Sequence, residues 1–181
     1  MDFFKNLPNF ITLARLCLVP VSVVLITSSQ WGSAFLVFVV AGLSDALDGW
    51  LAKTFHLTTE LGAYLDPIAD KALLVTIFIT LTIMHVVPVP LTVLVVSRDF
   101  MIVGAVLMGQ IMGKGLEIRP LFISKLNTTA QLAFVGLILL LRALGRATDG
   151  VDIEIAMIVV ALLTLMSAGA YLRQWLRHMN A

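Results

Sequence analysis

The sequence predicts an all-α integral membrane protein with six transmembrane helices and a short N-terminal interfacial segment. Two observations lead to this prediction. The 181 residues are 60% hydrophobic and 13% charged, with a mean hydropathy of +1.02, whereas a soluble domain is about half apolar and a quarter charged. The apolar residues also lie in long runs, each close to the 20 or so residues that a helix needs to cross a bilayer. We expect one domain over residues 1–181.

Short polar or proline-containing connections separate the apolar runs and set their expected bounds. Residues 1–7 mix aromatic and charged side chains, as interfacial segments do, and Pro8 suits the first turn of a helix. The first run lacks the small-residue cleavage site of a signal peptide, so we expect it to be retained. The six expected spans are residues 8–27, 34–54, 60–86, 91–112, 121–144 and 153–172.

Basic residues in the connections predict the orientation of the chain. With the N-terminus inside, the inner segments carry Lys5, Lys53, Lys114, Arg119, Lys125, Arg173 and Arg177. The outer connections after the first and third spans have no Lys or Arg, and only Arg142 and Arg146 oppose the pattern. We expect a bacterial inner-membrane protein with both termini and the active site on the cytoplasmic side. The net charge of +1 gives no sign of nucleic-acid binding.

Four aspartates in the second and third spans are the main candidate functional residues. They are Asp45 and Asp48, then Asp66 and Asp70. At about 100° per residue, each pair lies on one face of its helix, so two facing stripes would bring the carboxylates together. Carboxylates in hydrocarbon are costly and are functional candidates by default. Four like charges need cations among them, and Mg²⁺ or Mn²⁺ is the expected partner; the alternative is a buried structural network.

The residues around these aspartates follow the pattern D-x2-D-G-x2-A-K-x8-G-x3-D-x3-D. This pattern resembles the motif of the CDP-alcohol phosphatidyltransferases, membrane enzymes of phospholipid synthesis. The resemblance implies two divalent ions held by the aspartates, with Asp70 also acting as the base for the acceptor hydroxyl. Lys53 stands where the family usually has arginine, which keeps the charge but loses the bidentate fork. The residues implied in binding CDP-diacylglycerol are Asp48, Gly49, Ala52, Lys53 and Gly62; the three small ones also suit close helix packing.

Further stretches resemble one group within this family. Residues 6–15 are similar to the start of both phosphatidylglycerophosphate synthases and cardiolipin synthases. Residues 87–92 and 97–99, and residues 122–128 with Gln131, resemble cardiolipin synthases of the mitochondrial, CMP-forming type. This resemblance implies transfer of a phosphatidyl group from CDP-diacylglycerol to phosphatidylglycerol, giving cardiolipin and CMP, by a homodimer. The alternative is a phosphatidylglycerophosphate synthase, which uses glycerol 3-phosphate as acceptor.

Four polar residues of the fourth and fifth spans are candidates for binding the acceptor: Arg98, Arg119, Lys125 and Asn127. Arg98 and Asp99 lie too deep in the fourth span for free charges, so they form a structural pair or part of an anion site. The other three lie at the start of the fifth span, where helix-end amides and cations suit phosphate; they could also be membrane anchors. A cation transporter is the hypothesis from another class, although the sequence shows no related halves with broken helices.

Overall fold

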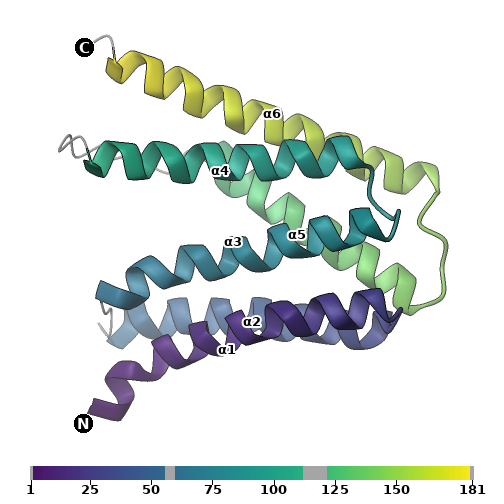
Figure 1. The fold of residues 1–181 in the computed structure, drawn as a ribbon, viewed down its shortest axis with the longest axis horizontal. Coiled ribbons are helices and arrows are strands. Elements are labelled where there is room, and N and C mark those ends of the chain that lie inside the picture. Colours follow the sequence, from purple (N-terminus) through teal and green to yellow (C-terminus); the bar gives the residue numbers. More distant parts are fainter. Residues whose placement is uncertain (1, 56–59, 112–121, 180–181) are drawn as a thin grey trace. The chain divides into compact units, whose positions relative to one another are not determined.

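In a computed structural model the described residues form six α-helices and no strand (Figure 1). The structure describes residues 2–55, 60–111 and 122–179, and it describes side chains for residues 13–44, 71–104 and 122–174. The helices are α1 Asp2–Thr27, α2 Trp31–Phe55, α3 Glu60–Ile83, α4 Val89–Ile111, α5 Phe122–Ala143 and α6 Val151–Met179. The all-α prediction is therefore confirmed for this part of the chain.

The six helices coincide with the six expected spans and differ from them mainly at the ends. Helix α1 begins at Asp2, so the expected interfacial segment is helical and continuous with the first span. Helix α6 continues to Met179, beyond the expected end at residue 172. Helix α4 begins at Val89 and holds Pro90 in its first turn, where the missing N–H of proline costs no helical hydrogen bond.

Two helices, in the described part of the chain, are long and apolar enough to cross a membrane: Phe122–Ala143 and Val151–Gln174. Only 33% and 22% of the residues in their apolar stretches are buried, and the exposed ones include the large apolar Leu162, Leu165 and Met166 on α6. Contiguous exposed apolar surface of this kind is unusual on a soluble monomer and suits contact with lipid. Their composition and exposure therefore agree with membrane-embedded helices.

The chain forms two compact units, which we describe separately. The first, called unit 1, comprises Met1–Val86 and Val135–Thr148; the second, unit 2, comprises Val87–Phe134 and Asp149–Ala181. In unit 1, α1 packs against both α2 and α3. A β-carbon at Gly136 would lie 3.4 Å from the ring of Phe38, so a small residue there allows the end of α5 to approach α2. In unit 2, α4 packs against α6.

Helices α1, α3 and α5 end in the same way, with a Schellman motif, in which two backbone hydrogen bonds close the last turn. In α1, the N–H of Ser29 donates to the carbonyl of Ile26 at 3.0 Å, and that of Gln30 donates to Leu25 at 2.8 Å. One residue in each motif takes the left-handed conformation, which costs a residue other than glycine about 1–2 kcal/mol. These residues are Ser29, His85 and Gly145, with φ of 58°, 55° and 67°.

Candidate functional site

The four motif aspartates lie on consecutive helices of unit 1. Asp45 and Asp48 are in the second half of α2, and Asp66 and Asp70 are in the first half of α3. Both helices are continuous through these positions, so the members of each pair share one helix face. Both helices also pack against α1. The backbone therefore places the two aspartate pairs on two helices that both neighbour α1, and the expectation that the two stripes face each other stays a prediction.

The side chains of residues 45–70 lie outside the described part of the structure. This covers the four aspartates and the predicted nucleotide-binding residues Gly49, Ala52, Lys53 and Gly62. Their roles as ligands, base and nucleotide contacts accordingly stay predictions. The chemistry of the donor set fits a hard divalent cation, because every predicted ligand is a carboxylate. Among the side chains that the structure does describe, no group of three His, Cys, Asp or Glu could hold a metal ion.

Arg15 of α1 is a buried cation to which the sequence analysis gave no role. Its side chain is 1% exposed, although a charged side chain is almost never fully buried unless it is paired. In the sequence of unit 1, the acidic residues are the four motif aspartates together with Asp2 and Glu60. The signal that could have singled it out is its position, an arginine in the middle of an apolar run on the helix that packs against both motif helices.

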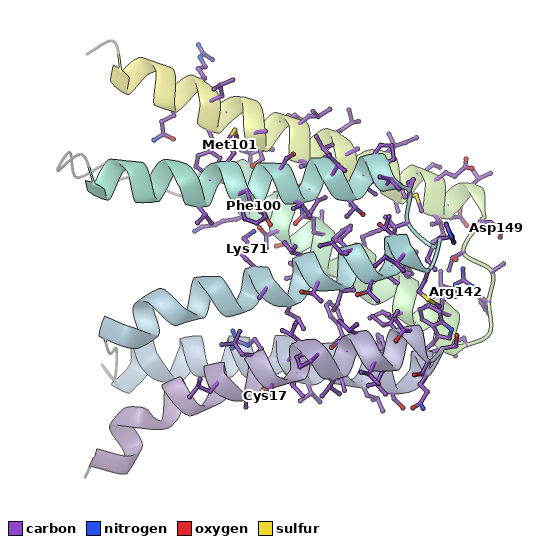
Figure 2. The ribbon with its side chains drawn as sticks, viewed as in Figure 1. Cys17, Lys71, Phe100, Met101, Arg142 and Asp149 are labelled. Atoms are coloured by element: carbon purple, nitrogen blue, oxygen red, sulfur yellow. The ribbon has the colours of Figure 1, made fainter. Side chains whose placement is uncertain are left out.

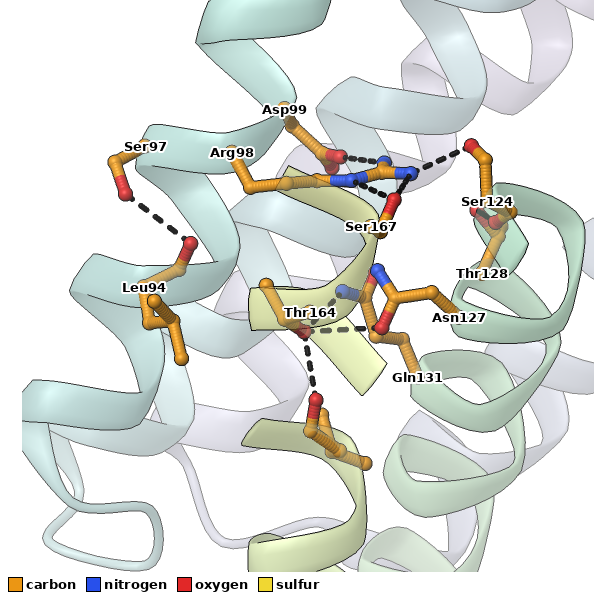
Figure 3. Close-up of polar contacts among 11 residues, drawn as sticks. Leu94, Ser97, Arg98, Asp99, Ser124, Asn127, Thr128, Gln131, Thr164 and Ser167 are labelled. Atoms are coloured by element: carbon orange, nitrogen blue, oxygen red, sulfur yellow. Dashed lines mark hydrogen bonds and ion pairs between the residues drawn. The ribbon is translucent and has the colours of Figure 1, made fainter. Parts of the chain in front are cut away.

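A buried polar cluster in unit 2 surrounds Arg98 (Figure 3). Arg98 and Asp99 of α4 are each 3% exposed, and Arg98 Nη1 donates to Asp99 Oδ1 at 2.6 Å. Its Nε and Nη2 donate to Ser167 Oγ of α6 at 3.1 and 2.7 Å, and Nη2 also donates to Ser124 Oγ of α5 at 2.5 Å. The guanidinium lies over the ring of Tyr171, 5.9 Å from its centroid. One side chain thus connects α4, α5 and α6.

Asn127 belongs to a second buried contact between α5 and α6, beside the Arg98 cluster (Figure 3). Thr164 Oγ1 lies 3.0 Å from Asn127 Oδ1 and 2.7 Å from the carbonyl oxygen of Val160, and its one hydroxyl proton serves both. Gln131 Nε2 donates to Thr164 Oγ1 at 3.4 Å. Asn127, Gln131 and Thr164 are all 0% exposed. These amides therefore act between helices within unit 2.

The predicted acceptor-binding residues take different positions in the structure. Arg98 and Asn127 are buried and bonded within unit 2, and the pair that the sequence offered as one alternative for Arg98 is present. Lys125 is exposed near the start of α5. Arg119 lies outside the described residues. The structure contains no lipid, so contact of these residues with an acceptor stays a prediction.

Comparison with known proteins identifies the family. The family model of the CDP-alcohol phosphatidyltransferases matches residues 5–172. The chain belongs to this family. It is 34% identical over 182 residues to the cardiolipin synthase (CMP-forming) of Homo sapiens, a match that covers 92% of this chain and 60% of the human protein. The cardiolipin synthase (CMP-forming) of Rattus norvegicus matches with the same identity and coverage.

Other members of the family that this chain resembles are named for a different acceptor. The CDP-diacylglycerol–glycerol-3-phosphate 3-phosphatidyltransferase of Bacillus subtilis is 28% identical, over 92% of this chain and 93% of that protein. The protein of the same name from Rickettsia prowazekii is 32% identical, over 96% of this chain and 97% of that protein. The relatives that this chain matches at similar identity are therefore named for two different acceptors.

Membership of the family confirms the coarser part of the sequence prediction. The CDP-alcohol phosphatidyltransferases are membrane-associated enzymes that use CDP-diacylglycerol and an alcohol acceptor. The family is generally dependent on divalent metal ions, in agreement with the all-carboxylate donor set on α2 and α3. The chain spans 60% of the length of the human and rat cardiolipin synthases.

Proposed function

We propose that this protein is a CMP-forming cardiolipin synthase, which transfers a phosphatidyl group from CDP-diacylglycerol to phosphatidylglycerol. The observation that carries the proposal is the spacing of the four aspartates on two continuous helices, α2 and α3, in a chain of this family. Phosphatidylglycerol as acceptor is supported by the 34% identity to the human and rat enzymes and by the cardiolipin-synthase-like stretches around Arg98 and Lys125.

In this reaction a hydroxyl oxygen of phosphatidylglycerol attacks the phosphorus that carries the diacylglycerol. A new phosphorus–oxygen bond forms, the pyrophosphate bond breaks, and CMP leaves. Asp45, Asp48 and Asp66 would hold the metal ions. Asp70 would accept the proton of the attacking hydroxyl and would also contact an ion. Two divalent ions bound there would neutralise the charge that develops on the attacking and leaving oxygens.

The remaining predicted residues bind the two lipids. Gly49, Ala52 and Gly62 leave room for the nucleotide beside α2 and α3, while Lys53 faces a phosphate. Lys125 and Arg119 contact the phosphate of the acceptor. Arg98 and Asn127, which the structure shows buried and bonded between helices, contribute to acceptor binding by fixing the start of α5, from which Lys125 projects.

The proposed membrane arrangement has six transmembrane helices, with both termini and the aspartates on the cytoplasmic side of a bacterial inner membrane. Helix α5 has 22 residues and is the shortest of the six, so each extends about 33 Å or more, enough to cross a hydrocarbon core of about 30 Å. The two units form one phosphatidyltransferase domain, because the family match runs through both. The active protein is a homodimer.

One alternative has a specific observation in its favour. The glycerol-3-phosphate transferases of B. subtilis and R. prowazekii are 28% and 32% identical over 92% and 96% of this chain, close to the 34% over 92% for the mammalian cardiolipin synthases. This similar identity makes phosphatidylglycerophosphate synthase the second candidate. The cation-transporter hypothesis finds no support in the family.

The acceptor and the metal requirement can be tested in one assay. Purified protein is supplied with CDP-diacylglycerol and Mg²⁺ or Mn²⁺, with phosphatidylglycerol or glycerol 3-phosphate, and the lipid product is identified by thin-layer chromatography. We expect cardiolipin and CMP in equal amounts from phosphatidylglycerol. Turnover with glycerol 3-phosphate alone would assign the protein to the second candidate. CMP release that persists in excess EDTA would contradict the metal mechanism.

Variants of the motif test the separate roles of the aspartates in the same assay. Asp45→Asn and Asp66→Asn should abolish turnover, because an amide supplies oxygen but no charge to the ions. Asp70→Asn should lower the rate about 10²–10⁴-fold, as expected for loss of a general base, while CDP-diacylglycerol still binds. Glu60→Gln, which removes an acidic group of α3 outside the motif, is the matched control and should retain activity.

A further inference from the structure

Unit 1 contains a pocket of about 430 Å³ at the end where α1 and α5 finish and α2 begins. Its lining includes Ser29, Trp31, Gly32, Ser33 and Arg142. Asp45 is fourteen residues further along α2 than Trp31, which corresponds to about 21 Å along the helix axis. The pocket is therefore separate from the proposed catalytic site.

Arg142 is the charged residue of this pocket, and it lies in the last turn of α5 (Figure 2). Its guanidinium lies over the indole ring of Trp31, 5.5 Å from the centroid. Its Nε is buried and has no hydrogen-bond partner among the described residues. The stretches of unit 1 with described side chains contain no Asp or Glu. This cation is thus held in place by an aromatic ring, without a described anion.

The first turn of α2 supplies hydrogen-bond donors to the same pocket. The first helical hydrogen bond of α2 runs from the N–H of Ala34 to the carbonyl of Gln30 at 2.9 Å. The N–H groups of Trp31, Gly32 and Ser33 therefore have no acceptor within the helix. No described side chain caps them. The α-carbon of Gly32 faces open space, with no heavy atom within 4 Å of a β-carbon built there. The hydroxyl groups of Ser29 and Ser33 lie on exposed residues of the lining.

The electrostatic balance of the pocket favours an anion. The start of α2 carries a partial positive charge of about one half, while the ends of α1 and α5 each carry a similar negative charge. The full charge of Arg142 outweighs the remaining negative contribution. The last carbonyls of α1 and α5 also accept hydrogen bonds in their Schellman motifs, whereas the amides of α2 stay available. The structural alternative is that Arg142 only complements the end of its own helix.

We propose that this pocket binds a phosphate ester or phosphate anion, either the headgroup phosphate of a phospholipid or free inorganic phosphate. A tetrahedral oxyanion accepts hydrogen bonds from several directions, and an arginine fork beside a helix N-terminus supplies donors of this kind. Trp31 belongs to a residue type enriched where a membrane meets water. The proposal also gives a reason for the position of Arg142, which opposes the orientation predicted from the other basic residues.

The test compares two arginines that differ in their place relative to the pocket. Arg142→Gln removes the cation of the pocket, and Arg146→Gln removes the same charge from an exposed residue outside its lining. The probe is phosphatidic acid, whose headgroup is a phosphate alone, added to the purified full chain in detergent and EDTA and counted by native mass spectrometry. Diacylglycerol is the lipid control. We expect Arg142→Gln to weaken retention of phosphatidic acid about tenfold or more, and Arg146→Gln to leave it nearly unchanged.

A second pair of variants keeps the test independent of the arginine. Gly32→Asp places a carboxylate in the open space at the start of α2, where an acidic side chain suits the helix but repels a second anion. It should fold normally and lose phosphatidic acid, whereas Gly32→Ala should retain it. The proposal is overturned if neither phosphatidic acid nor inorganic phosphate gives a binding signal that Arg142→Gln and Gly32→Asp lose and that Arg146→Gln and Gly32→Ala retain.

A second experiment uses inorganic phosphate as the probe, and comparison with phosphatidic acid shows whether the ligand is a free anion or a lipid headgroup. If free phosphate is the ligand, it raises the thermal unfolding midpoint of the wild type and of Arg146→Gln but not that of Arg142→Gln. In that case the protein retains phosphatidic acid little better than diacylglycerol. If a lipid headgroup is the ligand, phosphatidic acid gives the arginine-dependent signal and millimolar phosphate does not. CMP formation by Arg142→Gln should equal that of the wild type, so the outcome does not depend on the proposed reaction.

Discussion

Arg98 and Arg142 are two arginines on apolar helices, and their surroundings differ. In unit 2, Arg98 is almost fully buried and donates to Asp99, Ser124 and Ser167. In unit 1, Arg142 is only half-buried and its described contact is the ring of Trp31. Because a buried charge is tolerated when its donors are satisfied, Arg98 is explained by its own helices. No described residue accepts a hydrogen bond from Arg142, which is why we propose a ligand for it.

The largest expected effect is the loss of stability when the buried pair of unit 2 is broken. Arg98→Met removes the cation next to Asp99 and the link to Ser124 and Ser167, which should cost about 3–5 kcal/mol of unfolding free energy. Unfolding of the purified protein in detergent, followed by circular dichroism against denaturant, measures this cost. The same measurement on Arg98→Met/Asp99→Leu should recover most of the loss, because an apolar pair leaves no buried charge.

The double variant also separates the contribution of Arg98 to folding from its contribution to acceptor binding. If Arg98→Met/Asp99→Leu is stable and turns over with a normal apparent KM for phosphatidylglycerol, Arg98 contributes to folding alone. A stable double variant whose KM rises only for phosphatidylglycerol would show that the contacts of Arg98 also contribute to acceptor binding. If Arg98→Met is as stable as the wild type, Arg98 is not a structural residue and the contrast with Arg142 is wrong.

The fold was predictable because hydrophobic run length and connection composition are local properties of the chain. All six helices were expected, and the misplaced ends have local causes. Residues 2–7 and 173–179 mix charged and apolar side chains, so hydropathy alone excluded them from α1 and α6, although their backbone continues each helix.

The candidate sites were predictable to different degrees, depending on the sequence distance between their parts. The aspartates of α2 and α3 follow a fixed short spacing, so the motif could be found without a structure. The pair of Arg98 with Asp99 was one of the two alternatives that the sequence offered. Its contacts with Ser124 and Ser167 could not be found, because these residues lie 26 and 69 positions away and a serine in an apolar helix is ordinary. The pocket of Arg142 had one weak signal, a basic residue on the side expected to lack them, but its approach to Trp31 required the fold.

The second largest effect concerns the backbone that shapes the pocket of unit 1. Gly145 has a φ of 67° and ends α5 next to Arg142, so Gly145→Ala should lose about 1–2 kcal/mol of unfolding free energy. A β-carbon there meets no atom within 4 Å, so the loss comes from the backbone alone. Ser29→Gly, at the equivalent position of α1, should gain stability by a similar mechanism. Equal effects of the same sign for the two variants would contradict this account of the helix ends.

The smallest expected effect is that of Arg142→Gln on stability in the absence of a phosphate ligand. The variant loses a cation–π contact with Trp31, worth about 0.5–1 kcal/mol at a partly exposed site, and it breaks no described ion pair or hydrogen bond. A double-mutant cycle with Trp31→Leu, read from the same denaturant unfolding, should recover a coupling of this size. A loss from Arg142→Gln as large as that from Arg98→Met would mean that Arg142 is a structural residue, like Arg98. A small loss would instead show that the guanidinium is dispensable for folding, as expected if its role is to bind an anion in the pocket.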